Sequence, residues 1–249
     1  MAESFARVET KYMLSPDQAA YLEERLRKRG FERSFFGSPT VQSLYYDTPD
    51  HLLIRQSLER PAYKEKLRLR AYGEPGCLTR SFVEIKKKYQ GVVYKRRVAL
   101  PLRTAMTGLQ SGIFPAETGQ VGREAMWMVR HYGLIPAAVV SYDRDAWFSA
   151  EEENVRITFD RNLLFRTWDP DLNRKTDNLP LTDSASRLME IKTPGTCPLW
   201  LTRLLEETGA MRIHFSKYGL GYRKYILQDG KGTGRSEWKC STASLLMGA

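Results

Sequence analysis

The chain has 249 residues, of which 42% are hydrophobic and 27% are charged, proportions that indicate a globular protein and exclude a disordered one. At this length the chain can bury a sizeable core, as one large domain or two small ones. Its 39 Lys and Arg residues outnumber 29 Asp and Glu residues, and the formal net charge of +10 favours a polyanionic partner such as nucleic acid, an acidic membrane or a phosphate compound.

The first hundred residues are predicted to form a strand, a capped helix and then four strands. Residues 6–14 alternate polar and apolar side chains, which indicates a strand. Residues 15–30 indicate a helix, because Ser15 is a preferred N-cap, Gln18 completes a capping box and Gly30 suits the helix end. Period-two alternation predicts further strands over residues 41–50, 64–73, 80–89 and 92–100.

The second half of the chain is predicted to contain two helices and three strands. A helix over residues 122–133 ends at a glycine, and a second helical stretch covers residues 197–209. Strands are predicted over residues 137–148, 155–160 and 186–193. Strands outnumber helices, so we expect an α+β domain at residues 1–229. The Gly-, Ser- and Thr-rich residues 230–249 predict a loose C-terminal tail.

One face of the predicted hairpin at residues 82–97 is almost purely ionic. Side chains alternate across a strand, so residues spaced by two share a face. With a turn at Gly91, one face collects Glu84, Lys86, Lys88, Lys95 and Arg97. The opposite face carries Val83 and Ile85, which suits packing against a core.

The same pattern recurs in the other predicted strands. Basic residues occupy polar strand faces as Lys11 beside Glu9, Arg68 with Arg70, Arg144 with Tyr142, Arg156, and Lys192 beside Glu190. Polar strand faces are most often the solvated side of an antiparallel sheet. Here long cations dominate, and they would repel one another unless an anion lay among them. A closed antiparallel β-barrel with flanking helices, with the cations inside, would place that anion in a tunnel of low dielectric constant.

These segments, taken in order, resemble the catalytic domain of the vacuolar transporter chaperone family, a branch of the triphosphate tunnel metalloenzymes. The resemblance covers roughly residues 5 to 227 and rests on RVETKY, SLYYDTPD, KLRLRAY, FVEIKKK, VYKRR, SYDRDAW, VRITFD, LMEIKT and FSKYGLGY. It implies a closed antiparallel tunnel. It also implies a metal-dependent polyphosphate polymerase that transfers the γ-phosphate of ATP to a growing inorganic polyphosphate chain, with Mn²⁺ or Mg²⁺ as cofactor.

Site residues follow from this resemblance position by position. It implies catalytic contacts to the reacting phosphates for Arg68, Arg70, Lys86, Arg144, Arg156 and Lys217. It implies substrate binding for Lys11, Lys95, Arg97, Tyr142, Lys192, His214 and Ser216. Glu190 is the implied metal ligand, since a hard divalent ion that bridges phosphates takes a carboxylate and keeps waters. Glu9 and Glu84 are expected to form ion pairs that orient the cations.

Two positions depart from the family pattern. Arg7 stands where related hydrolases and cyclases carry the first Glu of Glu-x-Glu-x-Lys, which favours the polymerase branch. His214 stands where the polymerases carry a Lys, and a neutral imidazole there would weaken anion binding.

Two other function classes remain open. One is a triphosphate hydrolase (tripolyphosphatase-like) or a cyclase on the same tunnel, and the other is a non-catalytic polyanion-binding protein. Stacked aromatic side chains among cations would indicate RNA binding. Tyr45, Tyr46 and Tyr94 are expected beside turns or on faces opposite the cations, so no nucleic-acid partner is expected. The sequence leaves protein partners, oligomeric state and product length open.

The cellular compartment is inferred from the cysteines and the apolar runs. Cys77, Cys197 and Cys240 form neither a paired framework nor a zinc motif, which favours a reducing cytoplasm. Nowhere do eighteen apolar residues follow one another, and the N-terminus lacks an export signal, so we expect no membrane span.

Overall fold

The computed structural model describes residues 7–34, 40–59, 61–90, 92–173 and 177–228. The predicted turn at Gly91 and the predicted tail at residues 230–249 lie outside these residues. Among the described helices, none is both long enough and apolar enough to cross a membrane.

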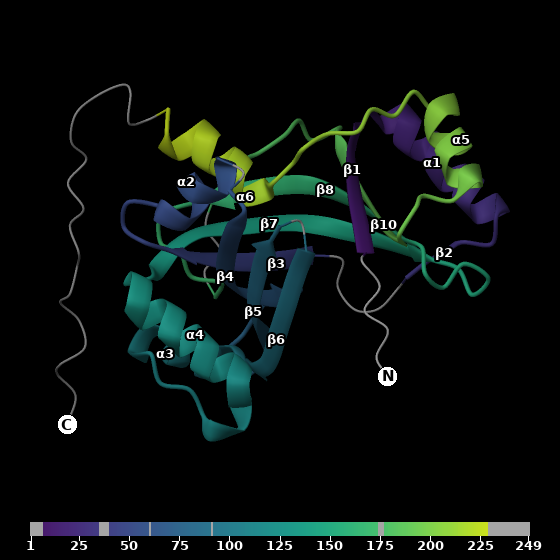
Figure 1. The fold of residues 1–249 in the computed structure, drawn as a ribbon. Helices are drawn as coiled ribbons and strands as arrows, with labels where there is room; N and C mark the ends of the chain where they lie inside the picture. The colour runs from purple at the N-terminus through teal and green to yellow at the C-terminus, as the bar shows by residue number, and fades with distance from the viewer. Residues whose placement is uncertain (1–6, 35–39, 60, 91, 174–176, 229–249) are drawn as a thin grey trace.

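A curled antiparallel sheet dominates the fold (Figure 1). Its strands are β1 (Arg7–Leu14), β2 (Glu32–Arg33), β3 (Thr40–Asp47), β4 (Tyr63–Tyr72), β5 (Arg80–Tyr89), β6 (Val92–Pro101), β7 (Ile135–Phe148), β8 (Arg156–Arg166), β9 (Leu179–Pro180) and β10 (Arg187–Pro194). The strand order is β1-β10-β8-β7-β3-β4-β5-β6, with β2 on β7 and β9 on β8. Every strand that the sequence predicted is present in the structure, and β8 extends beyond its predicted end.

The sheet is an open half-barrel, which corrects the prediction of a closed barrel. Its end strands, β1 and β6, do not pair with each other within the described residues. Part of the outer edge of β1 is instead used by the segment that precedes α6 (Lys217–Gly221). In this segment the amide of Ile213 donates to the carbonyl of Lys11 at 2.7 Å, and Arg212 forms an isolated bridge with Tyr12.

Two pairs of helices cover the outer, convex face of the sheet (Figure 1). The first pair, α1 (Pro16–Lys28) and α5 (Leu199–Glu207), packs on side chains such as Tyr12, Phe159 and Ile191. The second pair, α3 (Leu102–Ser111) and α4 (Gly119–Tyr132), packs on side chains such as Leu67 and Val83. The short turn η1 (Ala116–Thr118) leads into α4. The apolar strand faces therefore point outward against helices, as the alternation predicts.

A smaller group of helices closes one end of the concave face. It consists of α2 (Leu52–Leu58), α6 and the π-helical turn η2 (Tyr222–Ile226), which pack on inward-facing residues including Tyr45, Val140 and Phe165. The sequence did not predict α2 or α3. Both are short, and α3 contains threonines and a glycine, which are weak helix formers.

The capping box predicted for α1 is confirmed. The Gln18 amide donates to the Ser15 hydroxyl at 3.2 Å, and the Ser15 amide donates to the Gln18 side chain at 3.0 Å. The helix ends before Gly30, whose φ of +77° lies in the left-handed region that favours glycine. This helix start fixes where α1 leaves β1, and so where its apolar side meets the sheet.

Candidate functional site

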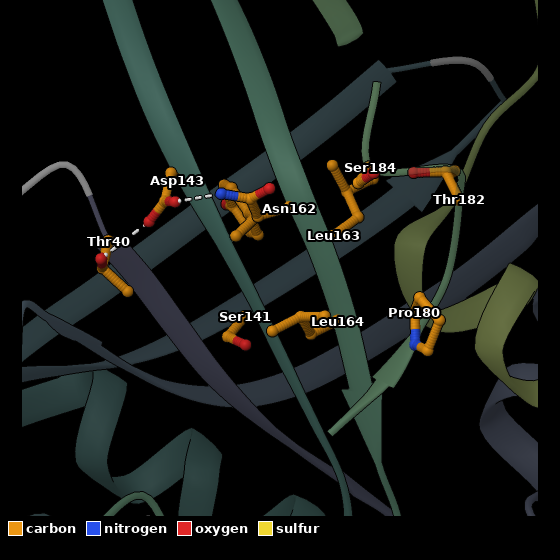
Figure 2. Close-up of a pocket in the computed structure, with 10 residues that line it drawn as sticks. Thr40, Ser141, Asp143, Asn162, Leu163, Leu164, Pro180, Thr182 and Ser184 are labelled. Carbon is orange, nitrogen blue, oxygen red and sulfur yellow. Dashed lines mark hydrogen bonds between the residues drawn. The ribbon is translucent and has the colours of Figure 1, made fainter. Parts of the chain in front are cut away.

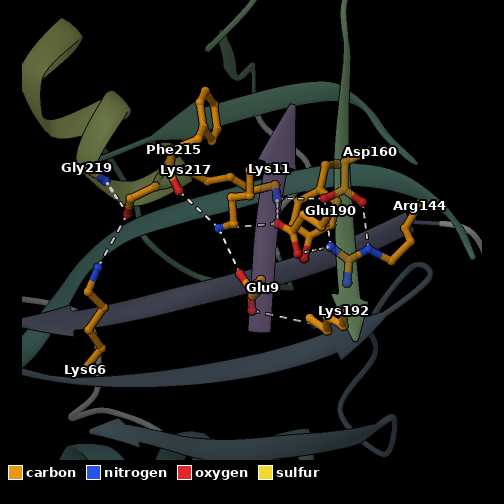
Figure 3. A network of polar contacts seen from close by, with 12 residues as sticks. Glu9, Lys11, Lys66, Arg144, Asp160, Glu190, Lys192, Phe215, Lys217 and Gly219 are labelled. Carbon is orange, nitrogen blue, oxygen red and sulfur yellow. Dashed lines mark hydrogen bonds and ion pairs between the residues drawn. The ribbon is translucent and has the colours of Figure 1, made fainter. Parts of the chain in front are cut away.

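One group of charged side chains, the Glu190 cluster, lies on the concave face across four neighbouring strands (Figure 3). Its members are Glu9 and Lys11 of β1, Arg144 of β7, Asp160 of β8, Glu190 and Lys192 of β10, and Lys217 of α6. In β1, β8 and β10 these residues alternate with apolar side chains that face α1 and α5. The period-two pattern therefore brings the charges together while it buries the core.

Glu190 lies at the centre of this cluster. One of its carboxylate oxygens is 3.1 Å from Nζ of Lys217 and 3.6 Å from Nζ of Lys11. The other oxygen is 3.6 Å from Nη2 of Arg144. Burial alone would raise the pKa of Glu190, but Lys217, Lys11 and Arg144 outweigh it and hold this pKa well below its ordinary value. Glu190 is therefore a carboxylate at neutral pH.

Asp160 is buried and holds two of the cations in place. Arg144 donates through Nε and Nη2 to its two oxygens at 2.6 and 2.7 Å, a bidentate pair. The Nζ atom of Lys217 lies 2.6 Å from the same carboxylate. Burial alone would lower the pKa of Lys217, but Asp160 and Glu190 outweigh it and raise this pKa above its ordinary value. Both cations are thus charged and fixed in direction.

A second group, the Glu84 cluster, lies on the concave face of β3 to β6. It consists of Tyr45, Arg68, Arg70, Glu84 and Lys95. The side chain of Glu84 is 1% exposed, and its oxygens lie 2.7 Å from Arg68 Nε, 3.7 Å from Arg70 Nε and 2.6 Å from Lys95 Nζ. Three cations surround one carboxylate, so the cluster keeps an excess of positive charge.

Tyr142 joins the two clusters into one surface. Its hydroxyl accepts a hydrogen bond from Nη2 of Arg70 at 3.3 Å. Its ring lies 4.4 Å from Nζ of Lys217 and 5.1 Å from the guanidinium carbon of Arg144. Both are cation–π distances. Cations from β1, β4, β6, β7 and α6 therefore lie along one continuous stretch of the concave face.

Acid is expected to weaken the fold through Glu84. Burial alone would raise the pKa of Glu84, but Arg68, Arg70 and Lys95 outweigh it and lower this pKa to about 2. A depressed folded-state pKa stabilises the protein above the unfolded-state value near 4.5, and this contribution is lost as the pH falls toward 2. A shift of this size corresponds to about 3 kcal/mol at neutral pH.

Urea unfolding of Glu84→Gln and wild type at pH 7 and pH 3 checks this expectation. The variant should be less stable by about 3 kcal/mol at pH 7, and the difference should shrink at pH 3, because there the carboxyl group is protonated in the unfolded chain but still largely ionised in the folded one. An equal difference at both pH values would contradict the assignment.

Asp47 connects the end of β3 to α2 and α6. Its carboxylate is buried and accepts from the amides of Leu53 at 2.8 Å and Ile54 at 3.0 Å. It also accepts from the hydroxyl of Tyr218 at 2.9 Å. The Tyr218 ring stacks on Tyr45 of the Glu84 cluster, with centroids 4.7 Å apart. Because Tyr218 directly follows Lys217, these contacts set the position of Lys217 over the concave face.

Tyr218→Phe should therefore displace Lys217 while keeping the ring stack. We expect a stability loss of about 1–2 kcal/mol, since a buried carboxylate loses one donor. If the concave face turns over ATP, the variant should also show a lower kcat. Tyr222→Phe is the matched control, because it removes the hydroxyl of a buried tyrosine in the next turn, whose ring packs against His51 at 5.5 Å. Loss of stability with wild-type kcat would show that Tyr218 does not position Lys217.

Most of the predicted site residues lie on this concave face, although their contacts differ. Lys11, Arg68, Arg70, Lys95, Tyr142, Arg144, Glu190, Lys192 and Lys217 belong to or join the two clusters. Lys86 lies across from Lys95, Arg97 across from Glu84, and Arg156 across from Lys192. Arg97 also lies over the Phe82 ring at 4.8 Å. Ser216 caps α6, whereas His214 is exposed in the segment before it.

Three residues of the site differ from what the sequence predicted. Tyr45 was expected away from the cations, but it lies on the concave face and accepts from Nη1 of Arg68 at 3.1 Å. Asp160 was not predicted as a site residue, although it lies on the same face of β8 as Arg156. Lys66 was not predicted either, although it shares a face of β4 with Arg68. The same two-residue spacing that predicted the other site residues also places Asp160 and Lys66 on the concave face.

The expected ion pairs of Glu9 and Glu84 are present. Glu9 lies 3.1 Å from Lys11 and 4.0 Å from Lys192. Burial would raise the pKa of Glu9, but Lys11, Lys86 and Lys192 lower it overall. Lys86 belongs to β5, near the other edge of the sheet, so its attraction to Glu9 of β1 acts across the concave face.

The chemistry of Glu190 decides which kind of metal site fits. Among the described residues, no three His, Cys, Asp or Glu side chains come together as a complete protein site. A Mg²⁺- or Mn²⁺-type ion is commonly held by one or two carboxylates together with substrate phosphates and waters. Glu190 suits that arrangement, because it is an ionised carboxylate on the concave face among cations that can also contact phosphate. The residues therefore fit an ion that binds together with phosphate.

A pocket of about 330 Å³ lies at the bulge of β7 (Figure 2). Within it, Asp143 accepts from the hydroxyl of Thr40 and the side-chain amide of Asn162, both at 2.8 Å. None of the residues that line this pocket is Lys or Arg. It is therefore distinct in chemistry from the cationic face and suits no polyanion.

Comparison with known proteins identifies the family. The VTC domain model matches residues 6–226, nearly the whole of the described chain. No curated protein matches the chain significantly.

Several solved structures are similar in fold. A protein of Bacillus halodurans described as a candidate adenylate cyclase superposes with a TM-score of 0.51 at 15% identity, covering 89% of this chain and 99% of its own. A candidate adenylate cyclase of Vibrio parahaemolyticus gives a TM-score of 0.49 at 15% identity, covering 88% and 98%. The Mimivirus capping enzyme triphosphatase gives 0.32 at 8% identity, covering 81% and 88%. The first of these supports the fold, and the family match over residues 6–226 confirms the resemblance found in the sequence: the chain belongs to the VTC domain family.

Proposed function

We propose that the protein is a metal-dependent polyphosphate polymerase that transfers the γ-phosphate of ATP to the end of an inorganic polyphosphate chain. The observation that carries this proposal is the continuous cationic surface formed by the Glu190 cluster, Tyr142 and the Glu84 cluster. A single triphosphate needs a compact pocket, whereas a growing chain needs cations along a path. Membership of the VTC domain family supports the same activity.

The residues suit phosphoryl transfer by positioning and charge neutralisation. The transferred group passes through a loose transition state, so donor and acceptor must be held in line while charge on the phosphate oxygens is stabilised. Arg68, Arg70 and Arg144 present guanidinium forks that match phosphate oxygens. Lys11 and Lys217 add point charges beside Glu190. When bound with substrate, a divalent ion at Glu190 would neutralise further phosphate charge.

The low pKa values of the two central carboxylates favour transfer to phosphate over hydrolysis. A hydrolase that activates water by general-base catalysis needs a group whose pKa lies near the working pH. Glu84 and Glu190 are surrounded by cations, which hold their pKa values low. A phosphate chain end is already ionised and needs no strong base. Neither Glu84 nor Glu190 therefore suits the role of general base, which supports the polymerase over a triphosphate hydrolase.

Incubation of the purified protein with ATP and Mn²⁺, followed by gel electrophoresis with polyphosphate staining, tests the proposal. We expect a ladder of long chains that requires the metal. Formation of shorter phosphates only, from ATP or tripolyphosphate, would replace the polymerase with the hydrolase. No turnover under any metal, with tight tripolyphosphate binding, would indicate a polyanion-binding protein.

A further inference from the structure

Lys66 lies between the two clusters without belonging to either. It is on β4, on the same face as Arg68, and its side chain is partly buried. Its Nζ atom lies 3.4 Å from the hydroxyl of Ser216, which caps α6 next to Lys217 (Figure 3). Lys66 thus reaches across the concave face from β4 toward the Glu190 cluster.

A row of three lysines crosses the sheet at this position. Lys66 lies directly opposite Lys86, which lies directly opposite Lys95. Lys95 forms an ion pair with Glu84 at 2.6 Å, a carboxylate that it shares with Arg68 and Arg70. Within the part of the chain that the structure describes, neither Lys66 nor Lys86 forms an ion pair with a carboxylate. Like charges directly opposite one another on neighbouring strands destabilise a sheet.

Such a row needs an anion from outside the chain. Glu84 already contacts Arg68, Arg70 and Lys95, and Glu190 already contacts three other cations. Ser216 offers Lys66 a neutral oxygen only, while it also accepts from the amide of Gly219 at 3.2 Å. Among the described residues, the charge of Lys66 therefore lacks a compensating carboxylate at a position between the two clusters.

We propose that Lys66 binds a phosphate group of the substrate and bridges the Glu190 and Glu84 clusters. The identity of the substrate as a phosphate chain rests on the proposed function. Inorganic tripolyphosphate is a suitable probe, because it carries the phosphate chemistry of both ATP and polyphosphate without a base or a sugar.

The surroundings of Lys66 add a pH dependence to this contact. Burial lowers the pKa of Lys66 to about 8, with attraction from Tyr45 opposed by repulsion from Lys64, Lys86 and Lys11. Below pH 8 the amine is charged and ready to bind. Above pH 8 binding must take up a proton, so affinity falls as the pH rises.

Tyr45 titrates over the same pH range, so its contribution to the pH dependence of binding must be separated from that of Lys66. Burial would raise the pKa of Tyr45, but Arg68, Lys66 and Arg70 lower it to about 8. Its ionised form would also repel phosphate at high pH. Lys66→Arg, which stays charged, should flatten the pH dependence of binding between pH 7 and 9, while Tyr45→Phe separates the contribution of the phenol.

Calorimetric titration with tripolyphosphate tests the proposal. We expect Lys66→Met to bind about ten- to 100-fold more weakly than wild type at pH 7, the loss of one charge-assisted contact. Lys88→Met is the matched control. It removes an exposed lysine from the same face of β5, two residues beyond Lys86, and should change affinity less than about twofold.

The outcomes separate this inference from the proposed function. The proposed Lys66 contact would be overturned if Lys66→Met and Lys88→Met lost the same amount of tripolyphosphate affinity. It would also be overturned if Lys66→Arg kept the wild-type pH dependence of binding. Tripolyphosphate binding that depends on Lys66, without polyphosphate synthesis from ATP, would support the contact and reject the polymerase. Absence of tripolyphosphate binding by wild type would reject both.

Discussion

Arg68→Ala is expected to lower kcat/KM for polyphosphate synthesis about 10²–10³-fold, the loss usual for one preorganised group that stabilises transition-state charge. Nε of Arg68 is 2.7 Å from Glu84, and Nη1 is 3.1 Å from the hydroxyl of Tyr45. These contacts hold the guanidinium in one direction before substrate arrives. Its side chain is 20% exposed, enough to meet a phosphate at the concave face.

Arg68 suits this experiment because its loss leaves the fold supported. Glu84 keeps Arg70 at 3.7 Å and Lys95 at 2.6 Å, so no buried carboxylate is left without a cation. Steady-state kinetics with ATP and Mn²⁺ measures the effect, and thermal unfolding checks the fold.

Arg96→Ala provides the matched control for Arg68. Arg96 lies on β6 of the same sheet, but it binds Glu124 of α4 at 2.8 Å on the convex face. The loss of this exposed ion pair should cost at most about 1 kcal/mol of stability and leave activity unchanged. Similar kinetics for the two variants would contradict a concave-face site.

Glu190→Gln is expected to lower metal-dependent turnover at least about 10²-fold. Tripolyphosphate binding should stay at or above the wild-type level. The amide is a poor ligand for a hard divalent ion. Lys11, Arg144 and Lys217 would lose the anion that they share and would remain available to phosphate. Turnover as a function of Mn²⁺ concentration and calorimetric binding measure the two effects separately.

Glu9→Gln is the control for the metal assignment. Glu9 is a half-exposed carboxylate beside Lys11 and Lys192 on the same face, and its removal should leave the metal dependence intact. If Glu190→Gln turned over as wild type does, the metal ligand would have to be sought at Glu9 or Glu84.

Local patterns predicted which strand faces carry charge. In the β5–β6 hairpin, two-residue spacing alone placed Lys86 and Lys95 on one side and Ile85 on the other, and the register agrees. The same reasoning predicted the outward packing of helices. These features depend on neighbours in sequence, where alternation determines the outcome.

Non-local contacts limited the prediction of closure and of the exact site. The edge of β1 is used by Arg212 and Ile213, two hundred residues away in sequence, and no periodicity reveals this. The adjacent Tyr45 and Tyr46 face opposite sides of β3 beside a bulge, and the sequence cannot tell which of the two faces the cations. Likewise, the bond from Tyr218 to Asp47 joins two motifs whose contact only the fold shows.

A crystal structure with Mn²⁺ and a non-hydrolysable ATP analogue tests the central claim most directly, because it locates the phosphates. The account predicts the triphosphate on the concave face between Arg68 and Arg144, with the metal at Glu190. Phosphates bound on the convex face, at the β7 pocket or away from these cations would contradict it.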